Sequence, residues 1–285
     1  MSKIKILCDS ASDIPKDKAK KYNIDVLPIT IIHNGKEYRD WYDFEPDEFY
    51  DILESGGEMP STSQVTPELF MTAYEDALEK GYEGILVVTL NSSASGTYQS
   101  AVIAKGFFEE KHGKKIEITI LDSGTFTYLI SVGLFIAAEK FEKGETLKDV
   151  YEYLQQFYTK IKAYVAVGTL EFLIKKGRIS HFSGFMGGIL NIKPIVKVAD
   201  TEINSVDKVR GSAAIVPKLI ELAEKEWDEN NYLFVIRARE CPEFHELIAA
   251  LKKRFPDKEI VIGNLGPVIS LNIGPYIVGL GYIAK

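Results

Sequence analysis

The chain has 285 residues, of which 46% are hydrophobic and 26% charged, a composition typical of a soluble globular protein with one large domain or about two smaller ones. Its 34 Lys and Arg residues against 41 Asp and Glu residues give a net charge of −7. A protein that binds nucleic acid or an anionic membrane surface needs a basic face, so this charge argues against both kinds of partner.

The cysteines and the chain's apolar stretches indicate where the protein resides. Cys8 and Cys241 lie far apart and form no metal-binding or redox spacing, so we expect two buried thiols in a reducing compartment. The amino terminus passes from charged residues directly into a strand-like segment, unlike a signal peptide. The most apolar stretch, 128–138, is too short to span a bilayer, so no membrane insertion is expected. These features predict a cytoplasmic protein.

Short apolar runs alternate with amphipathic segments in the first half of the chain. We expect strands at 4–8, 26–32, 84–90 and 116–121, and helices at 15–22, 46–53, 67–80, 97–110 and 127–143. The dipeptide Asn34-Gly35 is a strong hairpin signal. Strands that alternate with helices predict a mostly parallel sheet with helices on both faces.

The second half of the chain indicates a different sheet. We expect helices at 147–160, 213–226 and 242–255, and strands at 163–167, 192–198, 233–237 and 259–262. The region 192–210 looks like a hairpin around Asp200, which favours a mixed or antiparallel sheet. The sequence therefore predicts two α/β domains, 1–160 and 161–285. Two Gly-Pro steps bracket an apolar run at 266–275, which we expect to form a rigid loop, or a turn with a buried terminal strand.

Polar loops rich in hydroxyl groups follow three of the predicted strands, at 9–13, 91–97 and 122–125. Ligands bind beyond the carboxyl ends of strands in open α/β sheets, where these loops would converge. Taken one at a time, most of these Ser, Thr and Asp residues are explained as helix N-caps. The 91–97 loop exceeds what one cap requires, and its entry into a helix at Ser95 offers free backbone N–H groups to a carboxylate or phosphate. The hydroxyl cluster at 61–64 is either another N-cap or a second contact for a carboxylate.

Two further features leave alternatives open. The basic cluster 175–178 is either a helix C-cap or an anion-docking or partner-docking contact through the guanidinium of Arg178.

The sequence lacks a nucleophile elbow, a phosphate loop and a dinucleotide motif, and its four histidines are scattered. An enzymatic alternative is a metal-dependent hydrolase or phosphotransferase in which Asp9, Asp13 and Asp122 hold Mg²⁺. A third reading is a regulatory interaction module without a ligand.

Seven motifs, in order and across essentially the whole chain, resemble the DegV family of bacterial fatty-acid-binding proteins. They are DSASDIP, STSQVTP, SASGTYQSA, KKGRIS, NIKPI, KVRGSAA and GPVISLNIGP. The resemblance implies a Rossmann-like N-terminal domain and a smaller α/β C-terminal domain, with a long-chain fatty acid such as palmitate buried between them. It implies a carrier rather than an enzyme, with no cofactor and no metal.

The resemblance also implies which residues bind the lipid. The carboxylate would be held by Thr62 and Ser95, and Arg178 is the arginine of the KKGRIS motif. Members of this type present the acyl carboxyl group to a separate fatty acid kinase. The chain departs from the family pattern at Ala94, where Leu is usual, at Asn272, where His is usual, and at Tyr276, where a small residue is usual. Asn272 can donate a hydrogen bond but cannot titrate, and Tyr276 is expected to line the pocket or to bond at its wall.

Overall fold

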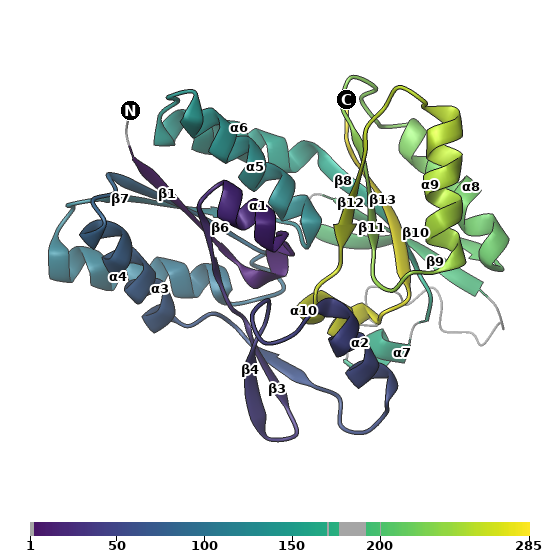
Figure 1. Cartoon of the computed structure of the whole chain (residues 1–285), viewed down its shortest axis with the longest axis horizontal. Helices are drawn as coiled ribbons and strands as arrows, with labels where there is room; N and C mark the ends of the chain where they lie inside the picture. Colours follow the sequence, from purple (N-terminus) through teal and green to yellow (C-terminus); the bar gives the residue numbers. More distant parts are fainter. Residues whose placement is uncertain (1–2, 170, 177–191, 200) are drawn as a thin grey trace. The chain divides into compact units, whose positions relative to one another are not determined.

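The computed structural model describes residues 3–169, 171–176, 192–199 and 201–285. The chain divides into two compact units (Figure 1). Unit 1 comprises Met1–Asp43 and Ser61–Tyr158, and unit 2 comprises Phe44–Pro60 and Thr159–Lys285. This division differs from the predicted domains 1–160 and 161–285 chiefly in the segment Phe44–Pro60, which belongs to unit 2. With that segment, the two units have nearly the same length.

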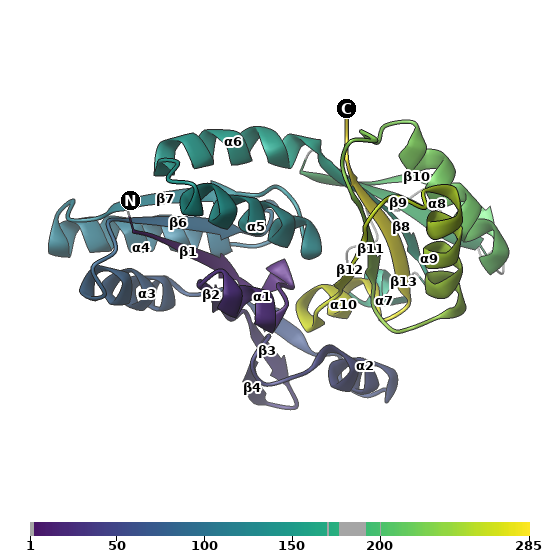
Figure 2. The ribbon, with the colours of Figure 1, turned by 45° about the horizontal axis from the view of Figure 1, so that its top comes forward.

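Unit 1 is built on a four-stranded parallel sheet with the strand order β2-β1-β6-β7. The strands are β1 (Ile4–Asp9), β2 (Ile24–Leu27), β6 (Gly84–Thr89) and β7 (Glu117–Asp122), and the helices are α1 (Lys16–Lys21), α3 (Pro67–Glu79), α4 (Thr97–His112), α5 (Tyr128–Glu142) and α6 (Leu147–Lys160). Helices α3 and α4 lie on one face of the sheet and α5 on the other (Figure 2). Residues of β6 are buried along its whole length, as expected for a strand covered on both faces. The predicted parallel sheet is therefore confirmed.

A second, antiparallel sheet in unit 1 has the order β4-β3-β5. Its strands are β3 (Thr30–His33), β4 (Lys36–Arg39) and β5 (Ser61–Ser63). Asn34 and Gly35 form the predicted hairpin turn, with φ angles of 49° and 71°. The single strand predicted at 26–32 is wrong. It is broken between β2 and β3 at Pro28, which has no amide hydrogen to continue a ladder.

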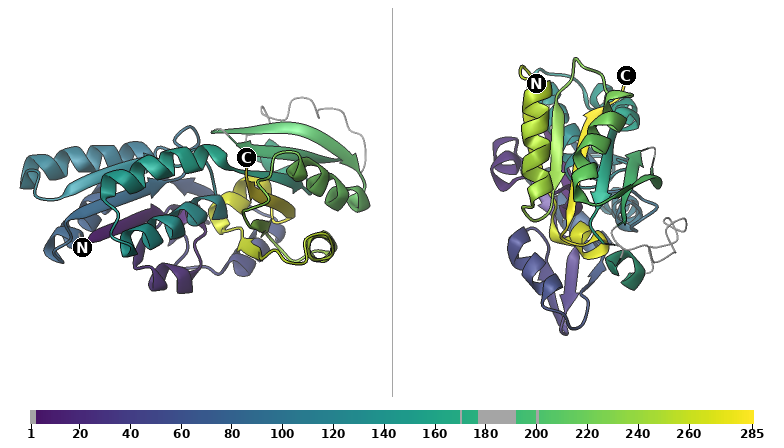
Figure 3. Two further views of the ribbon diagram at one scale, coloured as in Figure 1. Left: turned by 90° about the horizontal axis from the view of Figure 1, so that it is seen from above. Right: turned by 90° about the vertical axis from the view of Figure 1, so that its right-hand side faces the viewer.

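Unit 2 contains a six-stranded mixed sheet, which confirms the predicted sheet type. Its order is β10-β9-β8-β13-β11-β12, with antiparallel pairs except for β11 and β12. The strands are β8 (Ile161–Val167), β9 (Ile192–Ala199), β10 (Glu202–Arg210), β11 (Leu233–Arg237), β12 (Ile260–Asn264) and β13 (Ile277–Ile283). Helices α8 (Ile215–Glu224) and α9 (Pro242–Arg254) pack on this sheet, and Figure 3 shows them from two further directions.

Among the described residues, unit 2 also contains three short α-helices, and one of them corrects a prediction. They are α2 (Pro46–Glu54), α7 (Glu171–Lys175) and α10 (Pro267–Ile273). The segment 266–275 forms helix α10 rather than a rigid loop, and the buried terminal strand β13 starts after it. Pro267 opens the helix, and Gly274 ends it with a φ of +87°. A side chain at Gly274 would lie 2.6 Å from the Phe172 ring of α7, so glycine is required there.

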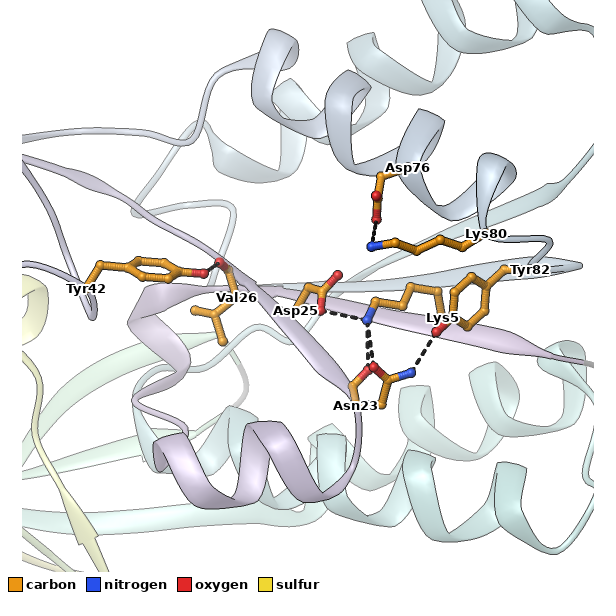
Figure 4. A network of polar contacts seen from close by, with 8 residues as sticks. All are labelled: Lys5, Asn23, Asp25, Val26, Tyr42, Asp76, Lys80 and Tyr82. Carbon is orange, nitrogen blue, oxygen red and sulfur yellow. Dashed lines mark hydrogen bonds and ion pairs between the residues drawn. The ribbon is translucent and has the colours of Figure 1, made fainter.

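A network of polar contacts at the amino end of the parallel sheet fixes the pairing of β1 with β2 (Figure 4). The Lys5 side chain is only 5% exposed, and its ammonium donates to the Asn23 carbonyl at 3.0 Å, to the Asn23 side chain at 3.3 Å and to the Asp25 carboxylate at 2.6 Å. Asn23 has a φ of 52°, and its amide donates to the Tyr82 hydroxyl at 2.7 Å. All three hydrogens of the buried ammonium therefore have acceptors within reach.

We expect Lys5→Met to lower the free energy of unfolding by about 2 kcal/mol, because the variant loses hydrogen bonds made by a charged group. Chemical denaturation measures this change. Lys80→Met serves as the control, because Lys80 forms an exposed ion pair with Asp76, which contributes little. Equal losses in the two variants would show that the Lys5 network does not stabilise the sheet.

The cysteines and the apolar stretches bear on two other expectations. Cys8 is buried, which raises the pKa of its thiol well above the usual value, whereas Cys241 is only partly buried. The prediction of two buried thiols therefore holds for Cys8 alone. None of the helices in the described ranges is both long and apolar enough to cross a membrane.

Candidate ligand-binding site

The strand order of unit 1 defines where a ligand-binding crevice is expected. From β1 the chain moves to β2 on one side, whereas β6 and β7 lie on the other side. In open α/β sheets, ligands bind at such a reversal, beyond the carboxyl ends of the strands. Here the reversal falls between β1 and β6. The short 3-10 helix Ser10–Ser12 follows β1, and the 91–97 loop follows β6.

Hydrogen bonds join the three polar loops at this edge, as the sequence predicted. The Asp9 carboxylate at the end of β1 accepts from the Leu90 amide at the end of β6, at 2.7 Å. The Asn91 amide donates to the Thr125 carbonyl at 3.0 Å, and the Asp122 carboxylate accepts from the Ser92 amide at 3.2 Å. These contacts connect the loop after β6 to its neighbours on both sides and hold its position.

The loop that carries Thr62 is hydrogen-bonded to the start of α4. The Gln64 side-chain amide donates to the Ser100 hydroxyl at 2.8 Å, and the Val65 backbone amide donates to the Thr97 hydroxyl at 3.4 Å. Thr97 in turn lies 3.0 Å, oxygen to oxygen, from the Ser95 hydroxyl. The two hydroxyl clusters that the sequence singled out are therefore parts of one hydrogen-bonded assembly within unit 1.

Ser95 lies at the amino-terminal end of helix α4, and Thr62 lies in the loop that is hydrogen-bonded to this helix. Thr62 is exposed and Ser95 half-buried. Helix α4 has 16 residues, and its N-cap, Gly96, provides no side-chain hydrogen bond. The amino end of a helix carries partial positive charge and free N–H groups, so it favours an anion. The Ser95 hydroxyl directly before this helix end is a neutral donor of the kind that a carboxylate accepts from.

Gly96 leaves room for the end of the Gln64 side chain where the two loops meet. A side chain at Gly96 would place its Cβ 2.0 Å from the Gln64 side-chain oxygen. We therefore expect Gly96→Ala to displace the Gln64 side chain from Ser100 and to weaken binding of an anionic ligand about tenfold, because the two loops lose one of the hydrogen bonds that join them. Gly106→Ala in the same helix is the matched control, since a Cβ there meets nothing within 4 Å. Isothermal titration with a long-chain carboxylic acid would measure both. Unchanged affinity in Gly96→Ala would contradict this role.

The three aspartates proposed as metal ligands bind protein groups instead. Asp9 accepts from the Ala11 and Leu90 amides, and Asp13 accepts from the Thr127 hydroxyl at 2.5 Å. Asp122 accepts from the Gly124 amide of its own loop and from the Ser92 amide of the loop after β6. Within the described residues, no group of three or more His, Cys, Asp or Glu side chains is placed to hold a metal ion. The geometry therefore gives the enzymatic alternative no support.

Asp9 and Asp40 form a pair of buried carboxyl groups next to this edge of the sheet, and no sequence pattern predicted the pair. Asp40 follows β4 and is 1% exposed, and hydrogen bonds from the Ser10 side chain and the Trp41 backbone offset only part of the cost of burying its carboxylate. Burial raises the pKa of Asp40 to about 6. Burial also raises the pKa of Asp9 to about 7, with a further contribution from the charge of Asp40. No local pattern marks Asp40, because its environment depends on residues far away in the chain.

The remaining predicted site residues lie elsewhere in the chain. Asn272 belongs to α10 of unit 2, is half-buried, and donates to the Val268 carbonyl at 2.9 Å. Tyr276 is 48% exposed and hydrogen-bonds to the Glu54 carboxylate, which raises the pKa of its hydroxyl. Arg178 lies outside the described residues. The structure thus places Thr62 and Ser95 in two loops that are hydrogen-bonded to each other, and the lipid-binding roles of Thr62, Ser95, Asn272 and Arg178 stay predictions.

Sequence reasoning identified the hydroxyl clusters, including Gln64 and Gly96, but missed the contact that joins them. Gln64 and Ser100 form the direct side-chain link, and Gly96 makes room for it. The available signal was an amide side chain at the end of one hydroxyl cluster and a glycine inside the other. Neither signal indicates a partner, because the partners lie 36 residues apart.

The fold and the site define a two-unit α/β protein with a pair of joined hydroxyl loops at the carboxyl edge of a parallel sheet. The family described as "Uncharacterised protein, DegV family" matches residues 3–285, so the chain belongs to the DegV family. Its similarity to the family therefore extends over both units.

Individual relatives agree with this assignment over their full length. A DegV domain-containing protein from Caldanaerobacter subterraneus is 34% identical, with 100% of both chains covered. A protein from Thermotoga maritima named a fatty acid-binding protein is 32% identical over 98% of this chain and 97% of its own. The crystal structure of a stearic acid-binding protein from Eubacterium ventriosum has a TM-score of 0.90 at 25% identity, covering 100% of this chain and 99% of that one.

Proposed function

We propose that this protein binds a long-chain fatty acid, such as palmitate, and that the hydroxyls of Thr62 and Ser95 hold its carboxylate. The observation that carries the proposal is the hydrogen-bonded junction of the two hydroxyl loops at the amino end of α4. Such a junction offers neutral donors and the positive end of a helix dipole to one anionic group. The names of the relatives supply the class of ligand.

Neutral donors suffice for a fatty acid because the acyl chain supplies most of the affinity. Burial of an acyl chain contributes about 0.8 kcal/mol per methylene, so about 14 methylenes contribute roughly 11 kcal/mol before the costs of ordering. The head-group site then needs to fix the position of the carboxylate rather than to provide the main binding energy. A polar metabolite would lack this contribution and would need more charged contacts.

The proposal includes a role as a cytoplasmic carrier in lipid transport or fatty-acid metabolism rather than as an enzyme. The aspartates at the strand ends are engaged by protein donors, which supports binding over catalysis. A bound fatty acid with a defined carboxylate position would be a suitable substrate for a separate fatty acid kinase, which forms an acyl phosphate.

Titration of delipidated protein tests the binding proposal. We expect saturable binding of one palmitate per chain and clearly weaker binding of methyl palmitate, because the ester lacks the anionic oxygen that the hydroxyls would bind. Equal affinities for acid and ester would contradict the carboxylate site. Absence of saturable binding of either compound would contradict the proposed function.

The prediction that Arg178 helps to dock a fatty acid kinase has its own expected result. Arg178→Ala should leave palmitate affinity and the melting temperature nearly unchanged and should lower the rate at which a fatty acid kinase phosphorylates the bound lipid. The Arg guanidinium is suited to docking a phosphate or an acidic surface. A lower melting temperature with unchanged phosphorylation would assign Arg178 to helix capping instead.

A further inference from the structure

The loop of unit 1 that carries Ser95 starts at a buried asparagine. Asn91 is 1% exposed, whereas the next two residues, Ser92 and Ser93, are exposed. At the far end of the loop, the Ser95 hydroxyl lies 3.0 Å from the Thr97 hydroxyl and accepts from the Thr97 amide at 3.3 Å. Those contacts fix the loop where it enters α4, so its shape before Ser95 must be set by residues nearer to β6.

Asn91 holds the two residues that come directly before Ser95. Its side-chain oxygen accepts from the Ser93 amide at 2.8 Å, and its backbone carbonyl accepts from the Ala94 amide at 3.1 Å. A side-chain acceptor two residues before the donor closes a tight turn, a role for which Asn is well suited. Two of the three residues between Asn91 and Ser95 are therefore bonded to Asn91 itself.

The nitrogen of the same side-chain amide fixes the loop to its neighbour. Asn91 Nδ2 donates to the Gly124 carbonyl at 3.2 Å, next to the bond from the Asn91 backbone amide to the Thr125 carbonyl at 3.0 Å. The receiving segment is itself well held, because Ser123 and Thr125 are buried and the Ser123 amide donates to the Thr89 carbonyl at 3.1 Å. Asn91 thus joins the loop to a buried segment of the same unit.

Both contacts require a side chain that accepts at one atom and donates at another. The Ser93 amide can only donate and the Gly124 carbonyl can only accept, so the oxygen and the nitrogen of the Asn91 side chain have fixed places. A carboxylate would lack the donor. The Asp122 carboxylate holds the backbone of Ser92, three residues before Ser95, and so leaves the turn itself to Asn91.

We propose that Asn91 is a positioning residue for the fatty-acid head group: its side-chain amide shapes the turn before Ser95 and fixes the loop to the segment after β7. This inference rests on the proposed function, in which the Ser95 hydroxyl donates to the carboxylate. Asn91 acts through the loop and does not touch the ligand. Its effect on affinity must therefore depend on the presence of the Ser95 hydroxyl.

A double-mutant cycle with palmitate tests this dependence. We expect Asn91→Ala to weaken palmitate binding about tenfold, and Asn91→Ala/Ser95→Ala to bind no more weakly than Ser95→Ala alone. Ser93→Ala is the matched control, because it removes an exposed side chain of the same loop and keeps the amide that bonds to Asn91, so it should bind like the wild type. In ligand-free protein, the amides of residues 93 and 94 should exchange hydrogen faster in Asn91→Ala than in Ser93→Ala, because the turn loses its side-chain acceptor.

The possible results separate the inference from the proposed function. Wild-type protein that binds no palmitate contradicts the proposed function, and unchanged affinity in Ser95→Ala contradicts both the proposed head-group site and the inference. Binding that is weakened by Ser95→Ala but not by Asn91→Ala overturns the positioning role alone. A loss in Asn91→Ala that is equally large without the Ser95 hydroxyl also overturns it, because it would show a general effect on the fold. If Asn91→Ala does not fold, Asn91→Ser, whose shorter side chain keeps an acceptor for the turn, replaces it in the same cycle and exchange measurement, with changes in the same directions expected.

Discussion

Replacement of both Thr62 and Ser95 by Ala is expected to weaken palmitate binding by at least about a hundredfold. Each hydroxyl would donate to an ionised carboxylate, and the loss of such a hydrogen bond costs about 1.5–3 kcal/mol. Two losses of that size correspond to roughly two to four powers of ten in the dissociation constant. Each single substitution should account for about half of the change in binding free energy, and isothermal titration of delipidated protein measures all three variants.

The control for this prediction is a ligand without the charge. Methyl palmitate keeps the acyl chain but cannot form the charged hydrogen bonds, so it should bind the double variant nearly as well as the wild type. Ser93→Ala controls for the loss of a hydroxyl in the same loop, because Ser93 is exposed and its hydroxyl is not part of the Gln64–Thr97 assembly. Palmitate affinities that agree within a factor of two between the wild type and the double variant would remove both residues from the site.

The second large effect concerns the buried carboxyl groups of Asp9 and Asp40 in unit 1. Their pKa values are raised to about 7 and about 6, whereas an Asp in an unfolded chain titrates near about 3.9. The folded state therefore binds more protons than the unfolded chain between about pH 4 and 7. The contribution of these groups to the free energy of unfolding is greatest below that window and is lost as the pH rises through it.

Asp40→Asn should therefore stabilise unit 1 at pH 8, by about 3 kcal/mol, since each pKa unit corresponds to about 1.4 kcal/mol. The fall in unfolding free energy between pH 4 and 7 should also become smaller, because the Asp40 charge also raises the pKa of Asp9. Urea denaturation at a series of pH values measures both effects.

Asp43→Asn provides the contrast for this measurement. Asp43 hydrogen-bonds to Arg39, which lowers the pKa of its carboxyl group, so this substitution should not stabilise the protein at pH 8. The account would be contradicted if the free energy of unfolding of the wild type rose from pH 4 to 7 and Asp40→Asn left it unchanged at pH 8. The buried carboxylates would then not destabilise the folded state.

Local sequence patterns were sufficient to predict the fold class. The alternation of buried strands and amphipathic helices predicted the parallel sheet of unit 1, and the hairpin signal in the 192–210 region predicted the antiparallel pair of β9 and β10. The polar loops after β1, β6 and β7 were predicted to converge, and the hydrogen bonds of Asp9 and Asn91 show that they do. These features depend on residues close to one another in the chain or on general rules of sheet topology.

Features that depend on distant partners could not be predicted. Nothing within Phe44–Pro60 indicates that α2 is anchored by Arg239, nearly two hundred residues later. The link between Gln64 and Ser100 and the burial of Asp40 likewise follow from the assembled structure. Helix α10 is a different case. Pro267 at its start and Gly274 at its end are ordinary helix boundary signals, and the sequence analysis interpreted them as loop residues.

The most direct test of lipid binding is to identify what the purified protein carries. The protein is expressed in bacteria, purified without detergent, denatured and extracted, and the extract is examined by mass spectrometry against an extract of the Thr62→Ala/Ser95→Ala variant. We predict close to one long-chain fatty acid per wild-type chain and much less in the variant. Wild-type protein that yields no fatty acid, and that takes up none when palmitate is added, would contradict the account.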